Sequence, residues 1–249
     1  NHLERALRPD TILVSVMAAN NEIGVLQPLR QIGQLCRQYH IMFHTDAAQS
    51  IAKILLDVNE LYIDLLSFTA HKIHGPKGIG GLYRRPGITL APQLHGGGQE
   101  GGFRAGTLPT PLIVGMAKAL ELGEASREAE GDRQRHLREQ LWQGIKKIGG
   151  VMLNGDWTER LPGNLNVSFE GVQGQQLLLA IQPHLALSSG SACSSHKSQA
   201  SHVLQALGRD RTQAQASLRF GLSRFTTPDE IQTAIAIVTQ IVNKIRQKQ

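Results

Sequence analysis

The chain has 249 residues, of which 41% are hydrophobic and 18% charged, typical of a globular protein with one large domain or two small ones. Its net charge of +6 is scattered and aromatic residues are only 4%, so the basic balance does not indicate nucleic-acid binding. No apolar run reaches the roughly 20 residues of a membrane helix, and two cysteines form no disulfide framework, so we expect a cytoplasmic protein that binds no membrane.

Strand-like and helix-like segments alternate in the first half of the chain. Strands are predicted at 11–16, 41–45, 63–68 and 79–83, with a helix at 29–39. This order predicts an α/β architecture with a largely parallel sheet, in which ligands bind just beyond the carboxyl ends of the strands. Polar residues follow three of these strands: Asn20, Asn21 and Glu22; Asp46 and Gln49; Thr69, His71 and Lys72.

The second half of the chain predicts a smaller α+β domain. Two long helices are expected at 110–126 and 130–149, the second one amphipathic and linking the domains. They are followed by strands at 164–169, 185–188 and 217–222 and by helices at 173–181, near 201–208, and at 228–247. We therefore expect a large domain over residues 1–125 and a small C-terminal domain over residues 126–249.

The stretch "SFTAHKIHGPKGIGGLY" at 67–83 places Lys72 where a strand ends and a glycine-rich loop begins. A lysine facing a carbonyl is a covalent catalyst, and the demanding case is the Schiff base with pyridoxal 5′-phosphate (PLP). PLP needs a carboxylate at its pyridine nitrogen and anion-binding groups at its phosphate. Asp46 could supply the carboxylate, Gln49 a donor to the ring hydroxyl, and Thr69 and His71 the phosphate contacts.

Other interpretations of this stretch remain open from the residues alone. Lys72 could be an ordinary solvated lysine, and Lys53 and Lys77 are rival candidates. His71 and His74 do not bring the three or four ligands of a zinc site, so we expect no metal in this chain. The glycines match neither a P-loop nor a Rossmann fingerprint, and they indicate a turn with a close backbone approach.

Cys193 lies in "LSSGSACSSHKSQ" at 187–199, a stretch of small polar residues without apolar periodicity. This pattern predicts an exposed loop, and the neighbouring His196 and Lys197 would favour the thiolate, so Cys193 is a candidate nucleophile. Cys36, in the helical "IGQLCRQY", is instead expected in the core.

The motifs, taken in order, resemble one known family. They are "NNEIGV", "HTDAAQS", "SFTAHKIHGPKGIGGLY", "HGGGQEGGFRAGT", "LNVSF", "SSGSACSS" and "SLRFGLSRFTT", and they extend over nearly the whole chain. Together they resemble the NifS/IscS-type cysteine desulfurases, PLP enzymes of the class V aminotransferase family. The resemblance implies a fold type I PLP-dependent transferase: a partial large domain with a mainly parallel sheet, plus a small C-terminal α+β domain.

The resemblance assigns the cofactor-binding residues. Lys72 matches the Schiff-base lysine, with His71 as a catalytic and cofactor-side histidine. Thr69 matches a phosphate-binding hydroxyl. Asp46 and Gln49 match the partners of the pyridine nitrogen and the ring hydroxyl.

The resemblance also assigns the substrate side. Asn21 matches an asparagine near both ring and substrate, and Arg219 matches the arginine that binds the substrate carboxylate. Cys193 matches the nucleophile that becomes a persulfide. Thr107 matches a threonine that reaches the phosphate of a neighbouring subunit, which implies a homodimer.

The implied activity is removal of sulfur from L-cysteine, giving L-alanine and a persulfide for iron–sulfur cluster assembly or another sulfur-transfer pathway. Implied partners are acceptor proteins such as an iron–sulfur scaffold. The alternatives are a non-catalytic remnant or interaction protein, and another class V enzyme such as selenocysteine lyase. Two departures stand out: Gly101 replaces a common arginine, and the family's N-terminal part, with its ring-stacking histidine and phosphate loop, is absent.

Overall fold

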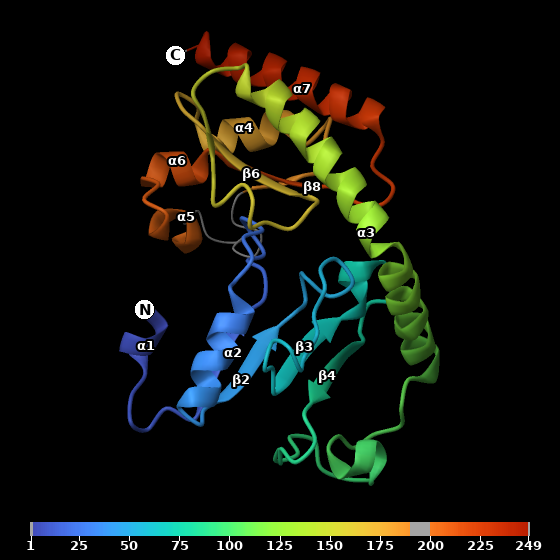
Figure 1. Cartoon of the computed structure of the whole chain (residues 1–249). Helices are drawn as coiled ribbons and strands as arrows, with labels where there is room; N and C mark the ends of the chain where they lie inside the picture. The colour runs from blue at the N-terminus through green and yellow to red at the C-terminus, as the bar shows by residue number, and fades with distance from the viewer. Residues whose placement is uncertain (1, 190–199, 249) are drawn as a thin grey trace. The chain divides into compact units, whose positions relative to one another are not determined.

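The computed structural model describes residues 2–189 and 200–248, which form two compact units (Figure 1). Unit 1 comprises Asn1–Ala18 and Gln27–Arg127, and unit 2 comprises Ala19–Leu26 and Glu128–Gln249. The segment Ala19–Leu26 thus belongs with the C-terminal half, which a division of the sequence at residue 125 does not capture. Among the described residues, no helix combines the length and apolarity needed to cross a membrane.

Unit 1 is an α/β unit with a mainly parallel sheet, as the sequence predicts. Its strands are β1 (Leu13–Met17), β2 (Met42–Asp46), β3 (Leu65–Thr69) and β4 (Gly80–Arg84), in the order β1-β2-β3-β4. The first three are parallel, and β4 pairs antiparallel with β3. The helical elements are α1 (His2–Ala6), α2 (Leu29–Gln38), η1 (Ala70–Ile73), η2 (Gln99–Gly102) and the first part of α3 (Thr110–Lys146).

The two faces of the unit 1 sheet differ in burial. Val14, Phe43 and Leu66 lie on the face that packs with α2, whose apolar residues recur at helical spacing. Cys36 on α2 belongs to this core and is only 1% exposed, which confirms its expected place. The opposite face exposes four large apolar side chains: Leu13, Met17, Met42 and Leu82.

Unit 2 contains a second, antiparallel sheet. Its strands are β5 (Val151–Leu153), β6 (Asn164–Phe169), β7 (Ser188–Ser189) and β8 (Ser217–Gly221), in the order β5-β6-β8-β7. Its helices are α4 (Gly174–Ile181), α5 (His202–Ala206), α6 (Arg211–Gln215), α7 (Pro228–Arg246) and the second part of α3. Figure 1 shows α4, α7 and the C-terminal part of α3 on one side of this sheet.

Strict alternation in β6 and β8 separates an apolar face from a polar one. Leu165 and Val167 point into the core formed with α3, α4 and α7. Asn166 and Ser168 point to the other face and are fully buried there. The antiparallel register pairs Asn166 with Arg219, so Arg219 lies on the polar face.

The sequence predictions in this half differ from the structure in some details. The two helices expected at 110–126 and 130–149 are one helix of 37 residues, because "REA" at 127–129 contains no helix breaker and no cap. The strand expected at 185–188 is β7 at Ser188–Ser189. Helix α6 was not expected, although Asp210 and Gln213 form a capping box at its start.

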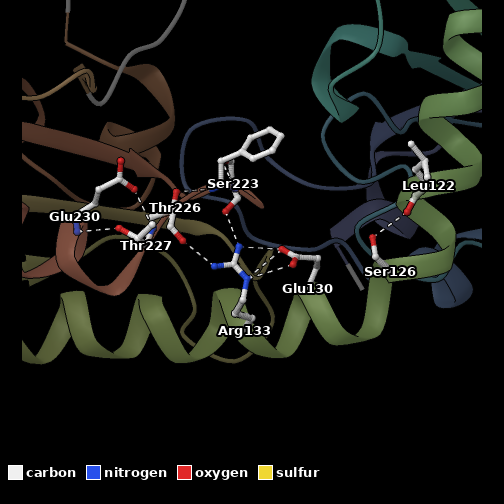
Figure 2. A network of polar contacts seen from close by, with 9 residues as sticks. Leu122, Ser126, Glu130, Arg133, Ser223, Thr226, Thr227 and Glu230 are labelled. Atoms are coloured by element: carbon white, nitrogen blue, oxygen red, sulfur yellow. Dashed lines mark hydrogen bonds and ion pairs between the residues drawn. The ribbon is translucent and has the colours of Figure 1, made fainter.

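The connection from β8 to α7 is fastened to α3 by Arg133 (Figure 2). The two terminal nitrogens of Arg133 donate to the carbonyl oxygens of Thr226 and Ser223, at 2.7 and 2.9 Å. The same guanidinium pairs with Glu130 one turn earlier, at 2.9 Å. A capping box of Thr227 and Glu230 then starts α7. Each of these two side chains accepts a hydrogen bond from the backbone N–H of the other residue, which stabilises the start of the helix.

Candidate functional site

The expected cofactor-binding residues of unit 1 gather where β2 and β3 end. Asp46 is the last residue of β2 and Thr69 the last residue of β3, and the parallel register aligns Asp46 with Ser67. Lys72 follows in η1, three residues after β3 ends. Parallel strands bring their carboxyl ends to the same sheet edge, which places these groups together as the sequence predicts.

Thr69 and His71 form a hydrogen-bonded pair. The Thr69 hydroxyl lies 2.8 Å from Nδ1 of His71 and 3.3 Å from the carbonyl oxygen of Ile79. The hydroxyl has one proton, so when that proton goes to Ile79, Nδ1 of His71 must be the donor to Thr69. The pair therefore offers a hydroxyl and an imidazole, two groups that can hydrogen-bond an anion.

The short helix η1 exposes the two side chains that the sequence assigns to the cofactor. Ala70 and Ile73 are buried and anchor this short helix, whereas His71 and Lys72 are exposed. His74 ends it in the left-handed conformation, with a φ of 66°. The anchor residues fix the helix, so the Lys72 amine projects from a well-supported backbone.

The glycines after η1 serve a turn and a close approach, as expected. Gly78 adopts a φ of +86°, which favours glycine. A Cβ on Gly80 would lie 2.5 Å from the carbonyl oxygen of Phe68, and one on Gly81 would meet the Phe68 ring. A larger residue at Gly80 would clash with the backbone of β3, and one at Gly81 would force the Phe68 ring to move.

Gln49 and Thr107 are the other two expected cofactor residues of unit 1. Gln49 is half-buried in the turn that follows β2. Thr107 lies on the exposed stretch between η2 and α3. Its role toward a neighbouring subunit stays a prediction.

The donor set of unit 1 fits PLP chemically. A carboxylate, a hydroxyl–imidazole pair and a primary amine lie at one sheet edge, and these are the groups that the pyridine nitrogen, the phosphate and the aldehyde require. Within the described ranges, none of the ion pairs involves Asp46 or Lys72. The Asp46 carboxylate accepts a hydrogen bond from the backbone N–H of Ala48 at 2.8 Å, which orients it at the strand end.

The expected substrate-side residues of unit 2 meet at a tight turn, Asn20–Val25, here called the 20–25 turn. Asn20 closes it, because its backbone N–H donates to Val25 and its carbonyl oxygen accepts from Gly24, both at 2.9 Å. The side-chain oxygen of Asn20 also accepts from the N–H groups of Glu22 and Ile23. The sequence "NNEIG" thus encodes a hydrogen-bonded turn with Gly24 at a positive φ of +72°.

Arg219 contacts this turn directly. One terminal nitrogen of Arg219 donates to the backbone carbonyl oxygen of Asn21 at 2.6 Å. The other donates to the hydroxyl of Ser188 at 2.8 Å. The structure therefore brings together the expected substrate residues Asn21 and Arg219, with Ser188 of β7 as an unexpected third partner.

The remaining predictions for the site concern the nucleophile and a metal. Cys193, with His196 and Lys197, lies outside the described residues. Among the residues that the structure does describe, no three His, Cys, Asp or Glu side chains cluster so as to hold a metal ion.

The sequence left Ser188 and His44 without an assigned role. Ser188 appears in the quoted motif "SSGSACSS", but only the pairing of β7 with β8 shows that it faces Arg219. His44 bridges the hydroxyls of Ser15 and Ser67, at 2.7 and 3.1 Å, across three neighbouring strands. The alternating pattern of β2 places His44 on the same face as Asp46, which was the available signal.

Comparison with known proteins identifies the family. Residues 1–233 match the Aminotransferase class-V model, and the chain belongs to this family. It is 51% identical over 247 residues to "Cysteine desulfurase IscS" of Aeromonas hydrophila, covering 98% of this chain and 61% of that protein. It is 50% identical to "Cysteine desulfurase, mitochondrial" of Eremothecium gossypii, covering 98% of this chain and 50% of that protein. The resemblance to the NifS/IscS type is thereby confirmed.

Solved structures agree on the fold. A "NifS-like protein" superimposes with a TM-score of 0.89 at 34% identity, covering 98% of this chain and 64% of that one. DndA from Streptomyces lividans gives a TM-score of 0.70 at 36% identity, covering 88% of this chain and 63% of that one. The fold is therefore that of the type I PLP-dependent transferases, and the family implies PLP as cofactor. The chain spans about 60% of the length of most of these relatives.

Proposed function

We propose that this chain belongs to a cysteine desulfurase, which removes sulfur from L-cysteine with PLP and gives L-alanine and a persulfide on Cys193. The observation that carries this proposal is the gathering of Asp46, Thr69, His71 and Lys72 at one edge of the unit 1 sheet. The 51% identity to a relative named cysteine desulfurase supports the same activity.

The proposed roles follow from the chemistry of each group. Lys72 holds PLP covalently, and Asp46 pairs with its pyridine nitrogen. Gln49 donates to the ring hydroxyl, while the Thr69–His71 pair contacts the phosphate. When bound, PLP supplies an electron sink for the carbon skeleton of the amino acid.

The substrate side supplies binding and the nucleophile. Arg219 binds the α-carboxylate of L-cysteine, a task that suits a planar guanidinium, and Asn21 lies beside it. The thiolate of Cys193 attacks the sulfur atom of the substrate and forms an S–S bond. The carbon–sulfur bond breaks, its electron pair stays with the carbon, and that carbon takes up a proton to become the methyl group of alanine.

The persulfide must then pass to an acceptor. We propose an acceptor protein such as an iron–sulfur scaffold, a homodimer in which Thr107 reaches the phosphate of the partner subunit, and a cytoplasmic location. The curated relatives include bacterial proteins named IscS and a mitochondrial one, which supports a compartment that keeps Cys193 reduced.

Substitution of Lys72 tests the cofactor assignment. Lys72→Ala should abolish the visible absorption band that purified protein shows with added PLP, whereas Lys77→Ala, five residues away, should keep it. Lys77 is exposed in the same loop and is therefore the matched control. Equal loss of the band in both variants would show that the lysine assignment is wrong.

Substitution of Cys193 tests the sulfur chemistry. Cys193→Ser should keep the visible band and the spectral response to L-cysteine, but stop persulfide formation and sulfide release in the presence of a reductant. Cys36→Ser is the control, because Cys36 is buried and should not take part. Sulfide release by Cys193→Ser at the unmutated rate would refute the nucleophile role.

A further inference from the structure

Arg219 is held at two points before any ligand arrives. The Asn21 carbonyl oxygen and the Ser188 hydroxyl each accept a hydrogen bond from a different terminal nitrogen of its guanidinium. A guanidinium is planar, so two contacts on its two terminal nitrogens fix the direction in which that plane faces. A two-pronged grip on a carboxylate depends on this direction.

The Asn21 carbonyl is itself held by unit 2. The next carbonyl oxygen along the turn, that of Glu22, accepts from the side-chain amides of Asn166 and Asn164, at 3.0 and 3.3 Å. The carbonyl oxygen of Gly24 accepts from the backbone N–H of Leu161 at 2.9 Å. The 20–25 turn is therefore bound along its backbone.

The buried side chain of Glu22 attaches the 20–25 turn to another element of unit 2. Glu22 is 7% exposed, and its carboxylate accepts a hydrogen bond of 2.5 Å from the hydroxyl of Ser201, which is 4% exposed. Ser201 also caps α5 by accepting from the N–H of Leu204. A buried carboxylate is unfavourable without such a partner, so the pair ties the turn to the start of α5.

We propose that Ser188, and Glu22 acting through the 20–25 turn, are positioning residues of a carboxylate subsite centred on Arg219. Ser188 holds one end of the guanidinium directly. Glu22 fixes the turn whose neighbouring residue, Asn21, holds the other end. The ligand class is the α-carboxylate of a small amino acid, which rests on the desulfurase function proposed above.

The first experiment needs no cofactor. Rotation of the Arg219 guanidinium is measured by NMR on protein with ¹⁵N-labelled arginine, with the signal assigned by its loss in Arg219→Lys. Ser188→Ala should speed this rotation about threefold to tenfold, the effect of losing one hydrogen bond. Ser188→Thr keeps a hydroxyl and should restore slow rotation. Ser126→Ala is the control, because the Ser126 hydroxyl donates to the carbonyl oxygen of Leu122 within α3, away from Arg219 in the chain.

The second experiment asks whether the effect depends on the ligand's carboxylate. L-alanine and L-alaninamide, which lacks the carboxylate, are titrated against PLP-loaded protein and followed by absorbance. Ser188→Ala and Glu22→Gln should weaken L-alanine binding about threefold to tenfold and L-alaninamide binding less than twofold. Glu230→Gln, which alters the capping box of α7, is the control for Glu22.

The outcomes separate the two proposals. Unchanged rotation in Ser188→Ala, or equal weakening of both ligands, would overturn the positioning role even if Lys72→Ala loses the visible band. Conversely, a visible band that survives Lys72→Ala would overturn the cofactor assignment, while faster rotation in Ser188→Ala would still support the positioning of Arg219.

Discussion

The two sheets differ in the face that lies opposite the apolar core, which is buried in unit 2 and partly exposed in unit 1. In unit 2 the face opposite the apolar core is filled by buried polar groups, so that every residue of β6 after Asn164 is buried. Asn154 there donates hydrogen bonds to the side chains of Asn166 and Ser168, both at 2.8 Å. The hydroxyls of Ser168 and Ser217 are hydrogen-bonded to each other at 2.7 Å. This network supports the face on which Arg219 lies.

In unit 1 the corresponding face is open. Leu13 is 42% and Leu82 54% exposed, and the polar bridge from Ser15 through His44 to Ser67 crosses the same face. A sheet face that exposes large apolar side chains is typical of a surface that another element covers. Arg219, the proposed substrate residue, therefore has its supporting contacts within unit 2, whereas the proposed cofactor residues lie on a sheet whose second face exposes apolar side chains.

The largest effect is expected from supplying the part of the relatives that this chain does not span. The family resemblance places a ring-stacking histidine and a phosphate loop there. Two charge-assisted hydrogen bonds to the phosphate, at roughly 1.5–3 kcal/mol each, would raise PLP affinity by about two to four powers of ten. Titration of the visible band, with alanine release from L-cysteine, measures the effect. Tight PLP binding and full turnover by the 249-residue chain alone would contradict this prediction.

Substitutions on the two faces of β2 should lower the free energy of unfolding by very different amounts. Phe43 is fully buried, and Phe43→Ala should lower the free energy of unfolding by about 3–5 kcal/mol. Met42, its neighbour on the other face, is 36% exposed, and Met42→Ala should cost less than about 1 kcal/mol in the isolated chain. Urea denaturation of both variants tests the contrast. Similar losses would mean that the open face of unit 1 is covered.

Two arginines of α3 that form ion pairs should contribute differently to stability, because only one of them also bonds to another part of the chain. Arg133→Ala removes the bonds to Ser223 and Thr226 as well as the pair with Glu130, and should cost about 1–3 kcal/mol. Arg135→Ala removes only an exposed pair with Asp132 and should stay within about 0.5 kcal/mol. Thermal unfolding at one pH compares them. Equal losses would show that fastening the β8–α7 connection adds nothing.

The smallest effect is a dependence on pH. The hydrogen bond from Arg133 lowers the pKa of Glu130 from its ordinary value of 4.5, which outweighs the effect of burial. The folded pKa therefore lies below the unfolded one, and the stabilisation is present above about pH 4.5 and is lost as the pH falls through the folded value.

Glu130→Gln should accordingly destabilise the protein slightly at pH 7, by about 0.2–1 kcal/mol, and by less at pH 3. The free energy of unfolding measured at the two pH values checks this, with Arg133→Ala as the background in which the difference should vanish. A larger loss at pH 3 than at pH 7 would reverse the sign and refute the assignment.

The sequence by itself determined the fold class, the strands of unit 1 and the family. These follow from local signals: apolar runs that end in polar residues, glycines where Phe68 comes close, and motifs such as "SFTAHKIHGPKGIGGLY" whose residue types suit PLP. The strands at 164–169 and 217–222 of unit 2 were also predicted from their sequences. Such signals are short-range, so one sequence is enough to show them.

Only the tertiary structure decided which distant residues meet. Ser188 and Arg219 are 31 residues apart, and Glu22 and Ser201 are 179 apart, so no local pattern could pair them. The same holds for the membership of Ala19–Leu26 in unit 2, since that segment follows β1 in the chain but is bound by Asn166 and Arg219. Strand pairing and buried hydrogen bonds arise from packing across the fold, and they determine how the groups recognised in the sequence are held.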